Sequence, residues 1–211
     1  MAGFKLVCFD LDDTLIMDIH SVMLPCILNG KGKELSIIEE REVSGELDYI
    51  AADYLKASLL RGFAECKIAD SFLEIAKPLK NISQVVDALH MEGIMCIVIT
   101  VGPRQVSKVV CDMYGFDDYY GSNYEVVDGV FTGKILDYVN AEEKVECLID
   151  FCNKHDIALD ECIAVGDGMT DVPIFDLCGK SIALNATADL RQYATFVIET
   201  RDLVDVLQYI V

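Results

Sequence analysis

Short apolar segments alternate with amphipathic segments along most of the chain, and this alternation restricts the fold more than any other feature of the sequence. Amphipathic spacing typical of helices occurs, for example, at 82–91 and 144–154. Alternating strands and helices form a parallel sheet with helices on both faces. The sequence therefore predicts an α/β fold with strands at 5–9, 95–100, 162–165, 181–184 and 195–198.

The alternation stops between the first two predicted strands. Helical spacing of apolar positions takes its place and is interrupted by glycine or serine, at 18–28, 32–43, 47–61 and 65–76. We therefore predict a small helical cap at 16–78, inserted into a discontinuous core formed by 1–15 and 79–211. Farther along, Asp128-Gly129 separates the apolar runs 124–127 and 130–132, which predicts a hairpin with a type I′ turn.

Composition excludes several classes of protein. The chain has 211 residues, of which 53% are hydrophobic and 25% charged, so it is long and apolar enough to form a globular core. Its net charge of −19 repels nucleic acid and anionic membrane surfaces. With no membrane-length apolar run and no signal-peptide pattern, we expect a cytoplasmic protein. The nine cysteines include no C-x-x-C pair and are predicted to be reduced core thiols. The oligomeric state stays open.

Polar side chains gather where the predicted strands end. In an open parallel sheet, ligands bind beyond the carboxyl ends of the strands, where successive loops converge. We therefore expect one site at this edge, formed by Asp10 and Asp12 after the first strand, Thr100 at the end of the second, and Asp167 with Asp171 after the third. Asp13 lies between these groups in the chain and is expected to be solvated or hydrogen-bonded locally.

Several carboxylates in one place repel one another unless a cation holds them together. Asp10, Asp167 and nearby backbone carbonyls offer only oxygen ligands, and no histidine or cysteine is placed to join them. Oxygen ligands suit Mg²⁺ much better than zinc. The sequence therefore predicts a Mg²⁺ site with catalytic carboxylates.

Four motifs together resemble those of the haloacid dehalogenase-like superfamily. They are D-x-D-x-T at 10–14, the hydroxyl residue Thr100, Lys144, and G-D-G-x-x-D at 166–171. The segments KPLKNISQVVDALHMEGI, VVDGVFTGKI and RDLVDVLQYI are similar to the phosphoserine phosphatase-like branch. The resemblance implies a Rossmann-like core with an inserted helical cap, and a phosphatase that acts on a small-molecule phosphomonoester.

The resemblance also implies a role for each motif residue. Asp10 would form an aspartyl-phosphate, and Asp12 would protonate the leaving alcohol and then activate water. Mg²⁺ would bind Asp10, Asp167 and the backbone carbonyl of Asp12. Lys144, Thr100 and the backbone amides of Leu11, Asp12 and Val101 would bind the phosphoryl oxygens. Asp171 would orient the lysine or a metal-bound water, and Thr170 would lie beside these groups without contacting the phosphate.

The sequence departs from the branch in the substrate pocket. Phosphoserine phosphatases place a glutamate early in the cap for the substrate ammonium and an arginine later for its carboxylate. Here the first position holds Ile19, between Asp18 and His20, and the second holds Lys56, with Arg61 nearby. A lysine keeps the charge but lacks the planar fork that matches a carboxylate. We therefore expect another small phosphomonoester with a neutral or anionic leaving group.

Four residues near the predicted pocket would determine which leaving group binds. Lys56 or Arg61 would read any negative charge on the leaving group, and His20 would contact the substrate. Asp18 offers the alternative, because a rotation into the vacant place would restore binding of phosphoserine.

The sequence bears on three alternative functions. A phosphotransferase would keep every motif residue, and only product analysis with an added acceptor separates it from a phosphatase. A non-catalytic protein that binds a phosphate ligand would be expected to lose Asp10, Asp12, Lys144 or Asp167, and all four are present. A dehalogenase needs neither Asp12 nor a metal, so the intact Asp12 argues against that activity.

Overall fold

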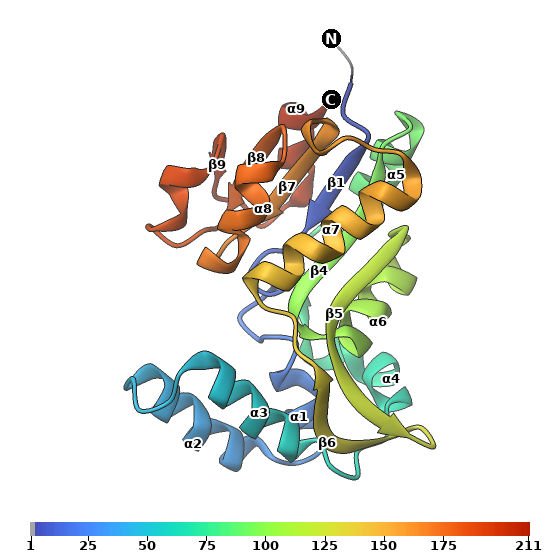
Figure 1. Cartoon of the computed structure of the whole chain (residues 1–211). Helices are drawn as coiled ribbons and strands as arrows, with labels where there is room; N and C mark the ends of the chain where they lie inside the picture. Colours follow the sequence, from blue (N-terminus) through green and yellow to red (C-terminus); the bar gives the residue numbers. More distant parts are fainter. Residues whose placement is uncertain (1–2) are drawn as a thin grey trace.

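The computed structural model describes residues 3–211 and contains a seven-stranded sheet. Neighbouring strands are parallel except for the antiparallel pair β5 and β6, so the predicted α/β fold is confirmed. The central strand β1 lies between β4 and β7 (Figure 1). In spatial order the strands are β6 (Val130–Asp137), β5 (Asp118–Val127), β4 (Met95–Pro103), β1 (Leu6–Phe9), β7 (Cys162–Gly166), β8 (Lys180–Leu184) and β9 (Phe196–Ile198).

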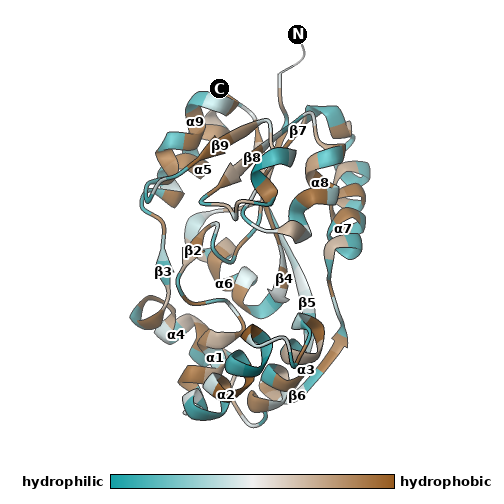
Figure 2. Ribbon diagram, turned by 90° about the vertical axis from the view of Figure 1, so that its left-hand side faces the viewer, coloured by the Kyte–Doolittle hydropathy of each residue, from teal (hydrophilic) through white to brown (hydrophobic). Residues whose placement is uncertain are grey.

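Helices cover both faces of this sheet (Figure 2). The side chains of β1 alternate between the faces: Val7 and Phe9 belong to one hydrophobic cluster, and Leu6 and Cys8 belong to the other. A strand that is buried on both sides needs apolar residues throughout, which explains the sequence LVCF. The first cluster includes residues of α5 (Ile82–Met91), α6 (Arg104–Tyr114) and α9 (Leu207–Ile210), and the second includes residues of α7 (Ala141–His155) and α8 (Val172–Leu177).

The segment predicted to be helical contains four helices. They are α1 (Met23–Leu28), α2 (Gly32–Val43), α3 (Tyr49–Leu59) and α4 (Cys66–Ile75). The two-residue strands β2 (Ile16–Met17) and β3 (Lys77–Pro78) pair with each other at the entrance and exit of this segment. The sequence analysis did not predict β2 and β3, since a two-residue strand has no periodicity to detect.

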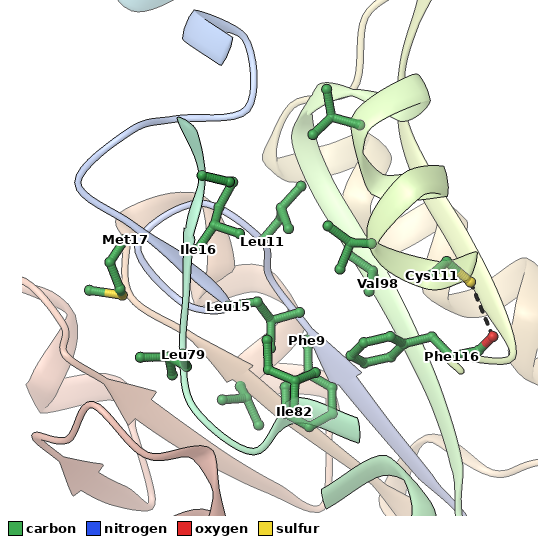
Figure 3. Close-up of a cluster of buried hydrophobic side chains, with 14 of the residues drawn as sticks. Phe9, Leu11, Leu15, Ile16, Met17, Leu79, Ile82, Val98, Cys111 and Phe116 are labelled. Atoms are coloured by element: carbon green, nitrogen blue, oxygen red, sulfur yellow. Dashed lines mark hydrogen bonds between the residues drawn. The ribbon is translucent and has the colours of Figure 1, made fainter. Parts of the chain in front are cut away.

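Buried side chains anchor the loop that follows β1. Figure 3 shows Leu15 and Ile82 beside Phe9, with Phe116 on the other side of that ring. The Phe9 and Phe116 rings meet edge to face, with 5.8 Å between their centroids. Leu11 and Leu15 are fully buried, and the backbone N–H of Leu15 donates to the Leu11 carbonyl over 2.9 Å. The chain is therefore held rigidly where the acidic residues leave the sheet.

The hairpin of β5 and β6 reaches from the sheet to the inserted helices (Figure 1). Asp128 and Gly129 have φ angles of 51° and 75°, so the predicted type I′ turn is confirmed. The hairpin also pairs with the inserted segment: Gly62 N–H donates to the Phe131 carbonyl, and Phe131 N–H donates to the Phe63 carbonyl, each over 2.9 Å.

Several smaller features complete the fold. All nine cysteines are free thiols. Six of them are buried, but Cys147 and Cys178 are half-buried and Cys66 is exposed on α4, so the prediction of core thiols is wrong for Cys66. No helix within residues 3–211 has the length and apolarity needed to cross a membrane. Short 3₁₀ turns occur at Leu159–Glu161, Met169–Asp171, Leu190–Tyr193 and Leu203–Val206.

Candidate active site

Lys144 joins two carboxylates at the carboxyl edge of the sheet. Its ammonium donates to Asp10 Oδ1 over 2.7 Å and to Asp171 Oδ1 over 2.8 Å, and its side chain is 1% exposed. Burial alone lowers the pKa of Lys144, but the charges of Asp10 and Asp171 outweigh burial and the pKa is raised. A capping box of Asn140 and Glu143 fixes the first turn of α7, which carries the lysine. The ammonium is thus charged and held in place.

Three carboxylates form a cluster around this lysine. Oxygen atoms of Asp10, Asp167 and Asp171 lie within 4.8 Å of one another. Burial raises the pKa of Asp10, with opposition from Lys144, and burial together with the charge of Asp171 raises the pKa of Asp167 to about 7. Thr14 donates its hydroxyl to Asp167 Oδ1 over 3.2 Å. The donor set contains only oxygen, so it fits a hard divalent cation, which would also relieve the repulsion.

Asp12 is oriented by a residue that the sequence analysis missed. Ser21 donates its backbone N–H to Asp12 Oδ1 over 2.5 Å and its hydroxyl to Oδ2 over 2.7 Å. Burial raises the pKa of Asp12, whereas the charge of His20 and the two Ser21 hydrogen bonds oppose the rise. A Cβ on Gly102 would come within 2.0 Å of the Ser21 hydroxyl, so this contact requires glycine at 102. No recognised motif includes Ser21.

Asp13 forms a local pair with His20, in line with its expected role. One ring nitrogen of His20 lies 2.9 Å from Asp13 Oδ2, and Asp13 has a positive φ of 53°. The hydrogen bond with Asp13 raises the pKa of His20 to about 9. The histidine is therefore a cation at neutral pH, and its charge is balanced by Asp13.

A cavity of about 210 Å³ opens between the sheet edge and the inserted helices. Thr100 lines it and accepts the Gly102 N–H through its hydroxyl over 3.0 Å. Leu11 has its side chain buried in the core, so only its backbone is left for the predicted phosphate contact. The lining residues are Asp10, Asp12, Asp13, His20, Val22, Glu42, Tyr49, Asp53, Lys56, Thr100, Val101, Gly102, Lys144, Asp167, Gly168 and Thr170.

Lys56 reaches this cavity, but acidic residues already surround its ammonium. Lys56 Nζ lies 2.6 Å from Glu39 Oε1, 2.8 Å from Glu42 Oε2 and 3.9 Å from Asp53 Oδ1. Burial alone lowers the pKa of Lys56, but its hydrogen bonds with Glu39 and Glu42 outweigh burial and the pKa is raised. The three acids were missed by the sequence analysis, because spacing within α2 and α3 does not show that the two helices face each other.

The other residues predicted for specificity lie outside the cavity lining. Asp18 points to Lys77 and Arg201, whose side-chain nitrogens lie 3.3 and 3.8 Å from its carboxylate. Ile19 packs against the hydrophobic core, and Arg61 is exposed beside the β5–β6 hairpin, near Gly133. The structure thus brings His20 and Lys56 to the cavity and leaves Asp18, Ile19 and Arg61 away from it.

The family model for haloacid dehalogenase-like hydrolases matches residues 7–176. This span contains β1, the inserted helices, Lys144 and the loop after β7. The chain belongs to this family. The resemblance predicted from the four motifs is confirmed.

Relatives place the chain beside one branch of the family. It is 28% identical over 209 residues to a phosphoserine phosphatase of Albidiferax ferrireducens, with 96% of this chain and 88% of the relative covered. It is 29% identical over 204 residues to that of Streptococcus thermophilus, with 96% and 94% covered. The family and these relatives confirm the prediction of an enzyme of the phosphoric monoester hydrolase class.

Solved structures show the same likeness. A phosphoserine phosphatase with an analogue of the phospho-aspartyl intermediate superposes with a TM-score of 0.82 at 25% identity, over 100% of both chains. A substrate-bound phosphoserine phosphatase superposes with a TM-score of 0.83 at 25% identity, again over 100% of both chains. The parallel sheet and the inserted helices therefore occur together in enzymes of this branch.

Proposed function

We propose that this protein is a Mg²⁺-dependent phosphatase that hydrolyses a small-molecule phosphomonoester through an aspartyl-phosphate on Asp10. One observation carries the proposal: Asp10, Asp12, Lys144 and Asp167, from three separate elements, line a single cavity. Lys144 contacts Asp10 directly over 2.7 Å. The relatives that act on phosphoserine support the same reaction class.

Asp10 is the nucleophile of the first step. A carboxylate oxygen of Asp10 attacks phosphorus, and the bond from phosphorus to the ester oxygen breaks. Lys144, Thr100 and the backbone N–H groups of Leu11, Asp12 and Val101 bind the phosphoryl oxygens and offset the charge that develops there. Asp171 also accepts a hydrogen bond from the ammonium of Lys144, over 2.8 Å.

Asp12 transfers the proton in both steps. In its acid form it protonates the departing alkoxide, and burial favours that form by raising the pKa of its carboxyl group. In the second step Asp12 takes the proton back from water, which attacks phosphorus, releases Asp10 and yields inorganic phosphate. Ser21 orients the carboxylate for both transfers.

The carboxylate cluster fits a magnesium ion. Asp10, Asp167 and the backbone carbonyl of Asp12 would hold it, and Asp171 is close enough to support the set. When bound, Mg²⁺ supplies positive charge beside the carboxylate nucleophile and the anionic phosphate.

The test is hydrolysis of an aryl phosphate. We expect Mg²⁺-dependent release of phosphate, loss of activity in EDTA, and no turnover in Asp10→Asn, which keeps the shape of the side chain and removes the nucleophile. Asp12→Asn should slow turnover by about 10²- to 10⁴-fold, and an aryl ester with a better leaving group should reduce that loss.

Two results would contradict the proposal. One is undiminished turnover by Asp10→Asn. The other is a phosphoryl group recovered mainly on an added alcohol, which would indicate a phosphotransferase. Asp112→Asn serves as control, because Asp112 is exposed on α6 and, within residues 3–211, forms an ion pair only with Lys108.

A further inference from the structure

The cavity has two chemically different ends. The phosphoryl group is bound among Asp10, Thr100 and Lys144 at the edge of the sheet if the proposed function is correct. The alcohol part of the ester then lies at the end formed by α1, α2 and α3, where Val22, Glu42, Tyr49, Asp53 and Lys56 line the cavity. The charges at this second end determine which leaving group the site accepts.

The single cation at that end is not free to bind a substrate anion. Lys56 contacts Glu39 and Glu42 over 2.6 and 2.8 Å, and its side chain is 4% exposed. The expectation of an anionic leaving group assumed an unpaired Lys56. A carboxylate brought to this lysine would come beside carboxylates that already occupy it, and like charges at such short range repel strongly.

Asp53 provides an acceptor at the same end of the cavity. Tyr138 donates its hydroxyl to Asp53 Oδ2 over 2.7 Å, which is the one side-chain hydrogen bond of this carboxylate in the described chain. Asp53 Oδ1 lies 3.9 Å from Lys56 Nζ, beyond hydrogen-bond distance. Burial raises the pKa of Asp53 to about 6, so the carboxylate is ionised at neutral pH. Its Oδ1 therefore keeps capacity for a cationic donor.

The charges at this end sum to an excess of negative charge. Glu39, Glu42 and Asp53 face one ammonium, that of Lys56. The charge of His20 is balanced by Asp13, and Arg61 does not line the cavity. Glu42 and Asp53 line the same cavity as the proposed phosphoryl-transfer residues, which bind the other end of the substrate. These two carboxylates therefore face the leaving group of the ester.

We propose that the substrate is the phosphate monoester of a small amino alcohol that carries an ammonium group and no carboxylate. The ammonium binds between Asp53 and Glu42, and the ester phosphate binds at Asp10. Hydrolysis breaks the bond between phosphorus and the ester oxygen and releases the amino alcohol and inorganic phosphate. The inference rests on the proposed function and adds the class of leaving group.

The test compares three esters of similar size: phosphoethanolamine, phosphoserine and phosphoglycolate. We expect kcat/KM to be highest for phosphoethanolamine, about tenfold or more above phosphoglycolate, from one favourable charge pair and one avoided repulsion. Asp53→Asn and Glu42→Gln should each lower the ratio of kcat/KM for phosphoethanolamine to that for phosphoglycolate by about tenfold. Glu40→Gln is the matched control, since Glu40 lies on α2 but is exposed and does not line the cavity.

Aryl phosphate hydrolysis by the same preparation separates the two proposals. If Asp10-dependent aryl phosphate hydrolysis is present and either carboxylated ester is preferred, the amino-alcohol inference is overturned and the proposed function stands. The inference is also overturned if neither Asp53→Asn nor Glu42→Gln changes the ratio. Should Asp53→Asn fail to fold, the ratio in Glu42→Gln decides. Absence of aryl phosphate hydrolysis overturns both proposals.

Discussion

Asp12 shows how one side chain is positioned by neighbours from separate parts of the chain, Ser21 before α1 and Gly102 in β4. Ser21 holds both carboxylate oxygens of Asp12, and Gly102 leaves just enough space for the Ser21 hydroxyl. The proton transfer proposed for Asp12 is efficient only if its carboxyl group lies at a suitable distance and angle from the leaving oxygen. The serine and the glycine therefore act through Asp12.

Gly102→Ala should impair turnover more than folding. The new Cβ would lie 2.0 Å from Ser21 Oγ and 3.2 Å from Asp12 Oδ2, so the serine and Asp12 must move. We expect kcat to fall by about 10- to 100-fold, as misplaced catalytic groups typically cause. The double variant Ser21→Ala/Gly102→Ala removes the clashing hydroxyl, so it should regain thermal stability without regaining kcat. Full kcat in Gly102→Ala would contradict this role for Ser21.

The pair of His20 and Asp13 should make stability depend on pH. Because the folded-state pKa of His20 is about 9 and its ordinary value is 6.5, its contribution is complete below pH 6.5 and is lost as pH rises through 9. We therefore expect the difference in unfolding free energy between the wild type and His20→Asn to shrink from pH 6.5 to pH 10. Urea unfolding of both proteins at each pH measures this difference. A difference that stays constant over that range would show that the pair of His20 and Asp13 does not make stability depend on pH.

At the scale of elements, Lys56 holds α2 and α3 together. The two helices contribute Glu42 and Asp53 to the cavity lining. The buried ammonium of Lys56 keeps these two carboxylates and Glu39 close to one another. Removing one partner from a buried charge cluster leaves the others without compensation, which is the costly case for such pairs.

Lys56→Met should therefore destabilise the protein by about 3 to 5 kcal/mol, because methionine replaces the volume but not the charge. Arg41→Met is the control: Arg41 pairs with Glu46 over 2.8 Å, and both side chains are exposed, so its loss should stay within about 1 kcal/mol. Chemical denaturation of the two variants gives the comparison. Equal losses would mean that the Lys56 cluster is no stronger than a surface pair.

The same helices show where sequence reasoning reached its limit. Helical spacing located α2 and α3 to within a few residues. The motifs also predicted that Asp10, Lys144 and Asp167 belong to one site. The pairing of Lys56 with Glu39 and Glu42 depends on how two helices cross, which no local pattern encodes. The first half of β5 was missed for a related reason: its polar residues and Gly121 are held by β4, a neighbour distant in sequence.

At the scale of the whole molecule, the core and the inserted helices share one hydrophobic interior. The cluster that contains Val7 and Phe9 of β1 continues without a break to Phe63 and to Phe72 of α4. The hairpin of β5 and β6 adds backbone hydrogen bonds to Gly62 and Phe63. We propose that residues 16–78 form a cap over the cavity, and the continuity of the cluster indicates that this cap does not unfold on its own.

The protein should therefore unfold in one cooperative transition. Phe72 is fully buried in the cap, and Phe72→Ala should cost about 3 to 5 kcal/mol. We expect the variant to lower the single melting temperature by roughly 6 to 20 °C, the shift typical of that cost in a chain of this size. Calorimetry measures the transition, and hydrogen exchange reports whether α3 and β1 lose protection together. Ile37→Ala is the control, because Ile37 is 58% exposed on α2 and its truncation should leave the melting temperature nearly unchanged. A separate, earlier transition confined to 16–78 would show instead that the cap is an independent folding unit.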